Sequence, residues 1–252
     1  MKAFSVIGTK ETGKTTTIEH LIGELKKRRY SIGSIKDIHY EKFAIDTEGT
    51  NTHRHRLAGS ELVTARGYYE TDILFQEKLK IEDILRFYEQ DYVIMEGVTD
   101  YNIPLILCLK EGKDIRDYKG KEYFKRIFAV SGVVADGKKE IEGLPVIDAT
   151  GQASELVDLI EEKVYSLLPD FPPDCCDACG YSCRELGERI LKGRSRRKDC
   201  ILDRSDIKLE IDGKKIEIVP FVQDLLRDTL LALVSNLKGY KKEKSIKLTI
   251  GD

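Results

Sequence analysis

The sequence predicts an α/β protein with a doubly wound, mostly parallel sheet, followed by a small α+β region with a four-cysteine metal module. Three observations support this prediction. Apolar runs of strand length alternate with segments of helical spacing in the N-terminal part of the chain, a pattern typical of a parallel sheet with helices on both faces. A glycine-rich loop follows the first apolar run. Three of the six prolines lie together, directly before a cluster of cysteines.

The composition limits the class of protein. The chain has 252 residues, of which 41% are hydrophobic and 34% charged, as expected for a soluble globular protein of one or two domains. The net charge of −2 gives no general attraction to nucleic acid. The apolar run at 103–109 is too short to cross a bilayer, and the N-terminus lacks the pattern of a signal peptide. We therefore expect a cytoplasmic protein without membrane or nucleic-acid partners.

Strands and helices should alternate as far as residue 168. The evidence is the period of the apolar positions, together with the glycines and prolines that separate the runs. Strands are predicted at 3–7, 31–36, 61–65, 71–75, 92–95, 105–109, 127–134 and 146–147, and helices at 15–29, 81–89 and 152–167.

A proline-rich segment at 169–174 is interpreted as a linker, since such a run cannot continue a helix and tends to extend. It would separate a nucleotide-binding domain at 1–168 from a cysteine module at 175–203 and a C-terminal region at 204–252.

The C-terminal region shows a hairpin signal. Asp-Gly at 212–213 lies between two alternating runs, which predicts a β-hairpin of residues 207–211 and 214–219. A helix at 220–237 and a last strand at 245–250 are expected to follow.

Residues 8–15 read Gly-Thr-Lys-Glu-Thr-Gly-Lys-Thr and match the phosphate-binding loop G-x-x-x-x-G-K-S/T. The motif lies between a predicted strand and a predicted helix, where backbone N–H groups and the helix N-terminus can hold phosphates. Lys14 should reach the β and γ phosphates, and the Thr15 hydroxyl should bind Mg²⁺. The motif therefore predicts a P-loop NTPase. Its predicted nucleotide contacts are Gly8, Thr9, Lys10, Glu11, Thr12, Gly13, Lys14, Thr15 and Thr16.

A second acidic group is expected at Glu96, directly after the apolar run 92–95. The carboxyl ends of strands face ligands in open α/β sheets. Glu96 is thus predicted to hold Mg²⁺ through water, or to orient the attacking water. The alternative is a surface carboxylate at a strand end, but Gly97 favours the functional interpretation because a small residue admits a close ligand. Lys14 and Glu96 are the predicted catalytic residues.

The polar segment 35–59 follows the second predicted strand. One interpretation is a solvated loop. The other is a switch-like or substrate-binding segment, in which Lys36, Arg54 and Arg56 contact phosphates and Asp46 contacts the metal.

The order of these motifs resembles that of a known family. After the phosphate loop come Ile-Lys-x-x-His at 35–39, Asp-x-x-Gly at 46–49, Arg54 with Ala-Gly at 58–59, the strand that ends in Glu-Gly at 96–97, and Leu-Pro-Val-Ile-Asp at 144–148. Over roughly residues 1–168 the chain is similar to the molybdopterin-guanine dinucleotide biosynthesis protein B (MobB) family.

The resemblance implies a P-loop protein, commonly dimeric, that binds GTP with Mg²⁺, hydrolyses it weakly and assists the nucleotidyltransferase that attaches GMP to molybdopterin. The chain departs from the family at 36–40, where Lys-Asp-Ile-His-Tyr replaces a more usual Lys-His followed by a second histidine. An Asn-Lys-x-Asp guanine signature is also missing. Asp136 is the candidate for a contact with the guanine base, and the alternative is an ordinary turn before Gly137.

Four cysteines are spaced as Cys-x-x-Cys-x-x-x-Cys, followed after sixteen residues by another cysteine. Four thiolates suit a [4Fe–4S] cluster or a tetrahedral zinc ion, and three close cysteines with one distant favour the cluster. The spacing resembles the iron–sulfur module of Rnf-type and corrinoid proteins, although it is one residue shorter. Cys175 is interpreted as a spare thiol and Cys108 as a core residue. The predicted ligands are Cys176, Cys179, Cys183 and Cys200.

Together these features predict a GTP-binding accessory protein of molybdenum or tungsten cofactor biosynthesis with a fused iron–sulfur domain. Its expected partners are molybdopterin or its guanylyltransferase, a molybdo- or tungstoenzyme, and a second copy of the chain. A nucleotide-dependent iron–sulfur electron carrier or cluster-delivery factor is the alternative. A small-molecule kinase is a weaker third interpretation, because no arginine-bearing lid is evident.

Overall fold

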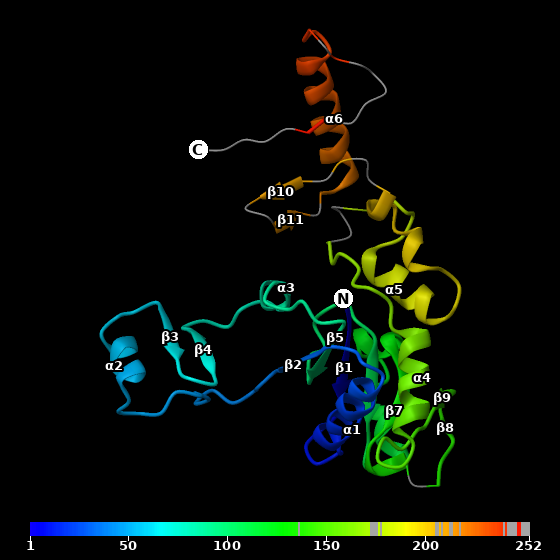
Figure 1. Ribbon diagram of the computed structural model, residues 1–252. Helices are drawn as coiled ribbons and strands as arrows, with labels where there is room; N and C mark the ends of the chain where they lie inside the picture. Colours follow the sequence, from blue (N-terminus) through cyan, green and yellow to red (C-terminus); the bar gives the residue numbers. More distant parts are fainter. Residues whose placement is uncertain are drawn as a thin grey trace. The chain divides into compact units, whose positions relative to one another are not determined.

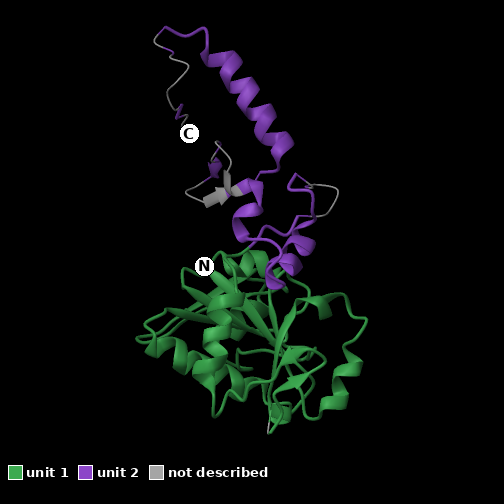
Figure 2. Cartoon of the chain, turned by 90° about the vertical axis from the view of Figure 1, so that its right-hand side faces the viewer, with its two compact units in different colours: residues 1–167 green, residues 168–252 purple. Residues whose placement is uncertain are grey.

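The computed structural model describes residues 1–135, 137–171, 176, 178–204, 207, 209–211, 214–216, 218–238, 240 and 246–247. It consists of two compact units, Met1–Leu167 and Leu168–Asp252, which are coloured separately in Figure 2.

A five-stranded parallel sheet forms the centre of the first unit (Figure 1). The chain forms β2 and β5 on one side of β1 and then β6 and β7 on the other, so the sheet order is β2-β5-β1-β6-β7. The carboxyl end of β1 therefore lies at the position where open α/β sheets bind ligands. The predicted mostly parallel sheet is confirmed. Its strands are β1 (Lys2–Ile7), β2 (Ile32–Lys36), β5 (Tyr92–Glu96), β6 (Leu105–Cys108) and β7 (Ile127–Ser131).

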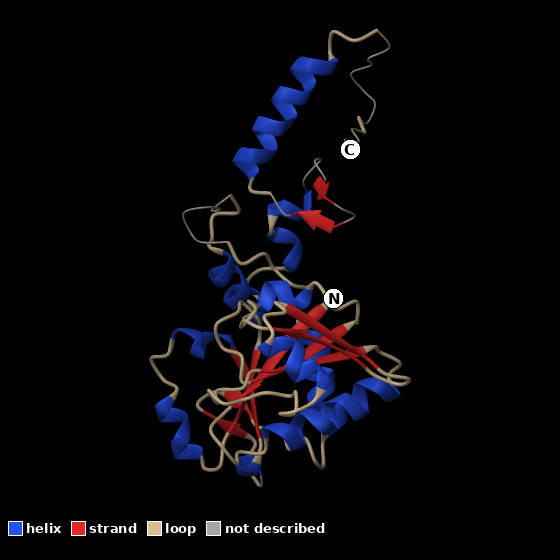
Figure 3. Ribbon diagram, turned by 90° about the vertical axis from the view of Figure 1, so that its left-hand side faces the viewer, coloured by secondary structure: helices blue, strands red, loops and turns tan. Residues whose placement is uncertain are grey.

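Both faces of this sheet are covered. Every residue of β6 and β7 is buried, which explains why these strands appear in the sequence as continuous apolar runs. One face packs against α3 (Ile81–Leu85) and the 3₁₀ helix η1 (Gly112–Asp117), through Leu85 and Ile115. Helix α1 (Lys14–Lys27) covers the other face and contacts β1 and β5. Figure 3 distinguishes the strands and helices by colour.

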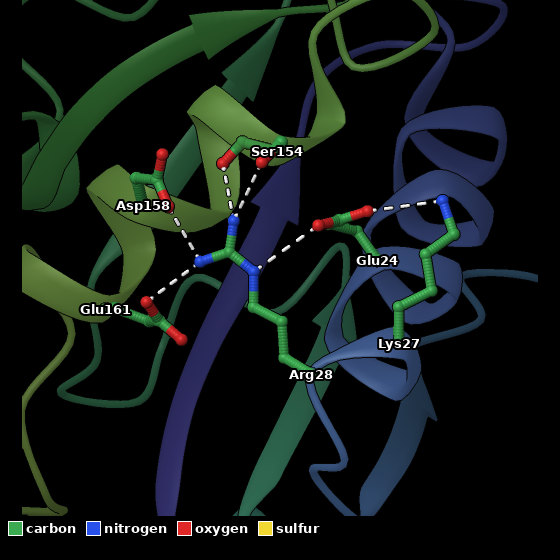
Figure 4. Close-up of polar contacts among 6 residues, drawn as sticks. All are labelled: Glu24, Lys27, Arg28, Ser154, Asp158 and Glu161. Carbon is green, nitrogen blue, oxygen red and sulfur yellow. Dashed lines mark hydrogen bonds and ion pairs between the residues drawn. The ribbon is translucent and has the colours of Figure 1, made fainter.

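Helix α1 packs against α4 (Ala153–Lys163), and a polar network joins the end of α1 to α4 (Figure 4). The Arg28 guanidinium lies 2.7 Å from Asp158, 2.9 Å from Glu161 and 3.3 Å from Glu24. It also donates to the carbonyl and hydroxyl oxygens of Ser154 at 3.0 and 2.9 Å. One arginine thus connects two helices that are distant in the sequence.

The two strands predicted between β2 and β5 are present, but they lie outside the parallel sheet. Strands β3 (Leu62–Arg66) and β4 (Thr71–Phe75) form a separate antiparallel pair, because the chain between them is too short for a parallel crossover. The polar segment before them contains helix α2 (Asn51–Leu57), which was not predicted. Its polar sequence lacks an apolar stripe, and none of its residues is buried.

The end of β7 also differs. The apolar run suggested a strand at 127–134, but β7 stops at Ser131 because Gly132 takes φ +85° and turns the chain into the 3₁₀ helix η3 (Val133–Ala135). Val146 then bridges to Val130 in the parallel sense. The remaining short elements of this unit are η2 (Glu122–Arg126), β8 (Glu140–Ile141) and β9 (Leu144–Pro145).

The second unit begins with helix α5 (Cys183–Leu191), whose Ser182 and Glu185 form a capping box. Strands β10 (Leu209–Ile211) and β11 (Lys214–Ile216) pair antiparallel. Most of the predicted strand at 245–250 and half of the predicted linker at 169–174 fall outside the described residues. No helix in the described part of the chain is long and apolar enough to cross a membrane. The other elements are η4 (Arg197–Asp199), η5 (Ile201–Arg204) and α6 (Pro220–Val234).

Candidate functional site

The phosphate loop connects β1 to α1 and is held by backbone that only glycine can adopt comfortably. Gly13 takes φ +88° where α1 begins. A Cβ at Gly8 would collide with the carbonyl oxygen of Cys108, and a Cβ at Gly132 would collide with that of Thr12. The amide of Val133 donates to the Thr12 carbonyl at 3.3 Å. The ends of β6 and β7 therefore support the loop from the side.

Lys14 lies across this loop. Its Nζ donates to the Thr9 carbonyl at 2.6 Å, and the Thr12 hydroxyl donates to the same carbonyl at 2.9 Å. Glu11, at φ +61°, pairs with Lys110 at 3.0 Å. The ammonium that the motif assigns to phosphate thus lies against the loop backbone, where the N–H groups of a phosphate loop converge.

Thr15 and Glu96, the two predicted magnesium ligands, lie together. The Thr15 hydroxyl donates to the Glu96 carboxylate at 3.3 and 3.4 Å. Glu96 is the last residue of β5 and pairs in register with Val6 of β1 and Lys36 of β2. A hydroxyl and a carboxylate are oxygen donors of the kind that Mg²⁺ prefers, so this pair fits the ion.

The same carboxylate has a cation partner that sequence reasoning did not place there. The Lys36 Nζ lies 3.2 Å from a Glu96 oxygen, and the Glu96 side chain is 13% exposed. The amide of Asp37 donates to the Glu96 carbonyl at 2.9 Å, while the Asp37 carboxylate lies 3.3 Å from Lys78. The sequence places Lys36 and Asp37 at the end of a predicted strand. Their position beside Glu96 could not be predicted from this, because it depends on the register between β2 and β5.

Two other predicted nucleotide contacts, Asp46 and Arg54, lie in the segment between β2 and β3. Asp46 accepts hydrogen bonds from the hydroxyls of Thr50 at 2.9 Å and Thr52 at 2.8 Å, which hold its pKa below the ordinary value, with the Thr52 bond the larger cause. Arg54 lies on α2. Within the described residues, no hydrogen bond or ion pair joins Asp46 or Arg54 to the phosphate loop. Asp136 lies outside the described residues.

Cys108 lies behind the loop and is fully buried. Its thiol donates to the Thr17 hydroxyl at 3.5 Å, and burial raises its pKa to about 11. The thiol is therefore protonated at neutral pH, as expected for a core cysteine.

The four predicted thiol ligands differ in burial. Cys183 and Cys200 are buried, while Cys176 and Cys179 are half-buried. Burial raises the pKa of the Cys183 thiol, and a backbone hydrogen bond from Phe171 offsets part of this rise. Among the residues that the structure describes, no group of three or more His, Cys, Asp or Glu is arranged to hold a metal ion.

A parallel sheet of this strand order, with a glycine-held loop at the end of β1 and a carboxylate at the end of β5, defines a P-loop NTPase fold. Residues 3–131 match the family model of the molybdopterin guanine dinucleotide synthesis protein B, MobB. The chain belongs to this family.

Relatives show how far the similarity extends. A protein of Methanocaldococcus jannaschii, assigned as a molybdopterin-guanine dinucleotide biosynthesis adapter, is 30% identical over 259 residues, which span 99% of this chain and 97% of the relative. A Bacillus subtilis protein with the same assignment is 24% identical over 57% of this chain and 83% of its own length. The crystal structure of Bacillus subtilis MobB has a TM-score of 0.54 at 22% identity, covering 66% of this chain and 100% of that one, and it supports the fold.

Proposed function

We propose that this chain is a GTP-binding adapter of molybdenum or tungsten cofactor biosynthesis, which assists the attachment of GMP to molybdopterin or the delivery of the product. The observation that carries the nucleotide part is the contact between Thr15 and Glu96 across the end of the sheet, beside Lys14. The family and the assignments of the two relatives support the place in cofactor biosynthesis.

In this proposal the loop residues bind the triphosphate. Backbone N–H groups and Lys14 hold the β and γ oxygens, so the Lys14 ammonium exchanges its bond to Thr9 for a stronger, charge-assisted bond to phosphate. Thr15 and Glu96 hold Mg²⁺, which neutralises charge on the phosphates. Hydrolysis is expected to be slow, in keeping with the role of an adapter.

Lys14→Ala tests the nucleotide site. Titration calorimetry with Mg²⁺·GTP should show at least a hundredfold loss of affinity, because a charged contact to phosphate is removed. Lys27→Ala is the matched control, since Lys27 lies on the same helix and pairs with Glu24 at 3.2 Å. Unchanged GTP binding by Lys14→Ala would contradict the assignment, and a parallel titration with ATP gives the base preference.

We further propose that the cysteine module binds a metal, as a [4Fe–4S] cluster or, alternatively, zinc. The spacing of the cysteines in the sequence supports this proposal. No functional step is assigned to the metal, because the described residues do not form a complete ligand group.

Anaerobic purification followed by an optical spectrum and metal analysis tests this module. A brown protein with iron and acid-labile sulfide is expected, and Cys200→Ser should lose the colour while Cys175→Ser keeps it. Zinc alone would favour the tetrahedral site, and protein free of both metals would refute the proposal.

A homodimer is also proposed. Six large apolar side chains of α2, β3, β4 and the turn between the two strands are exposed to solvent, namely Leu57, Leu62, Tyr68, Tyr69, Ile73 and Phe75. Light scattering should show twice the monomer mass, and a combined Tyr68→Ser and Tyr69→Ser variant should shift the equilibrium to monomer. A monomer at all concentrations would refute this part.

A further inference from the structure

The chain from the end of α5 into η4 forms a turn that is almost entirely basic. Residues 192–198 read Lys-Gly-Arg-Ser-Arg-Arg-Lys, so every residue except a glycine and a serine carries a positive charge. We call this segment the basic turn. The whole chain has a net charge of −2, so this concentration of cations is local and needs an explanation of its own.

Backbone hydrogen bonds fix the start of the basic turn. Gly193 takes φ +68°, and its amide donates to the Ile190 carbonyl at 2.9 Å. The amide of Arg194 donates to the Arg189 carbonyl, also at 2.9 Å. These two bonds form a Schellman motif, which ends a helix at a defined residue. The direction of the chain after α5 is therefore set by the backbone and does not depend on the charged side chains of the turn.

The rest of the basic turn is also supported by its surroundings. The Arg189 Nε atom donates to the Ser195 hydroxyl at 3.1 Å, and the Arg189 guanidinium lies 4.3 Å from the centre of the Tyr181 ring. The Arg196 amide donates to the Asp199 carboxylate at 2.8 Å, and the Asp199 amide donates to the Arg196 carbonyl at 2.9 Å. The Asp199 carboxylate next to the turn thus supports its backbone.

Four cations of the basic turn take no part in this support. They are exposed, and within the part of the chain that the structure describes their side chains form no ion pair or hydrogen bond. The dipole of α5 favours a cation at its C-terminus, but this effect fades beyond the last turn of a helix. Like charges that lie so close together repel each other, which costs stability unless a partner neutralises them. The four cations are Lys192, Arg194, Arg196 and Lys198.

The distribution of charge favours a protein partner over a nucleic acid. Nucleic-acid surfaces combine cations with aromatic rings that stack on bases. The Tyr181 ring of this unit already has the Arg189 guanidinium over one face. Glu185 lies near the opposite end of α5, about 10 Å along the helix axis from Lys192. The positive charge is thus confined to one end of the helix, which matches a compact group of carboxylates better than a long chain of phosphates.

We propose that the basic turn is a docking site for a protein partner that presents a cluster of carboxylates. Arg194 and Arg196 form the central contacts, because a guanidinium matches a carboxylate with two parallel N–H bonds. Lys192 and Lys198 add positive charge that speeds association. The turn is already formed, so docking does not have to order its backbone. The proposal does not depend on the nucleotide site, because every residue in it lies in the second unit.

The test uses two fluorescent probes of equal negative charge, a peptide of consecutive glutamates and an oligonucleotide of thymidines, titrated into the full chain by anisotropy. The peptide should bind saturably at low ionic strength, with an affinity that falls as salt is added, and the oligonucleotide should bind more weakly. Arg194→Gln combined with Arg196→Gln should weaken peptide binding about tenfold, because two exposed ion pairs are lost. Arg194→Lys combined with Arg196→Lys should weaken it about threefold, because the charge stays and the two-bond contact is lost.

Arg29→Gln combined with Arg66→Gln is the matched control, because both are exposed arginines of the first unit and the change in net charge is the same. This variant should bind the peptide as the wild type does, and circular dichroism checks that all the variants remain folded. Lack of saturable peptide binding by the wild type, or equal losses in the two glutamine variants, would overturn the proposal. So would tighter binding of the oligonucleotide than of the peptide, because the turn would then be a nucleic-acid site. GTP binding by the wild type, measured in the same samples, reports on the proposed function separately.

Discussion

Glu96→Gln is the sharpest test of the nucleotide site, because it should act in opposite directions with and without Mg²⁺. Glutamine keeps the size of the side chain and can still accept from Thr15, but it removes the charge that now pairs with Lys36 at 3.2 Å. With Mg²⁺ present, the protein loses a charged ligand of the ion. Without Mg²⁺, it loses a carboxylate that repels the phosphates.

The size of the effect follows from the burial of the side chain. Glu96 is 13% exposed, so its charge is poorly screened and a charged contact there should contribute about 1.5–3 kcal/mol. At about 1.4 kcal/mol for each tenfold change, Mg²⁺·GTP affinity should fall roughly ten- to a hundredfold. GTP affinity in the presence of EDTA should rise, because the carboxylate that repels the phosphates is lost.

Fluorescence titration with a labelled GTP analogue, in Mg²⁺ and in EDTA, measures both quantities on one sample. Asp37→Asn is the control, because Asp37 lies at the same edge of the sheet but its carboxylate contacts Lys78 and His39. Equal losses in Mg²⁺ and in EDTA would show that Glu96 supports the fold and not the ion, which would refute the reasoning.

Three further predictions concern stability. Gly132→Ala should destabilise the first unit by about 1–3 kcal/mol, since φ +85° is strained for alanine and its Cβ would collide with Thr12; a urea midpoint equal to that of the wild type would contradict this. Arg28→Ala should lower the free energy of unfolding in urea by about 2 kcal/mol, because the carboxylates and Ser154 on α4 lose their shared partner. Lys27→Ala should lower it by under about 1 kcal/mol. Equal losses would refute the role of Arg28 in joining α1 to α4. Ser182→Ala should cost about 1 kcal/mol through the lost helix cap, seen as reduced helical circular dichroism near the unfolding midpoint, and an unshifted curve would argue against the cap.

The sequence was most informative where one local rule determined the structure. Continuous apolar runs located β1 and β5, and the glycine and lysine pattern at 8–15 located the loop between β1 and α1. Helix α2 was missed because a cap by Thr50, and not an apolar stripe, defines its start. The end of β7 was missed because one glycine interrupts an otherwise apolar run.

The site was predictable only as separate parts. Thr15 and Glu96 were each expected from a local pattern, and parallel pairing brings them together. The contact of Lys36 with Glu96 depends on the register between strands that are distant in the sequence, which no local pattern shows. The same is true of Asp46, whose expected place at the nucleotide was inferred from sequence order and whose contacts depend on the folded turn before α2.

The hydrogen bond from Val133 to Thr12 sets a lower limit on the size of a working nucleotide-binding fragment. The phosphate-loop motif occupies only the start of the chain, yet the turn that supports it is formed by Gly132 and Val133, after the last strand of the sheet. A fragment that ends before β7 would retain the whole motif and lose the support that shapes it. If the chain is shortened step by step from its C-terminus, phosphate binding should therefore be lost abruptly near residue 135 and should not weaken gradually.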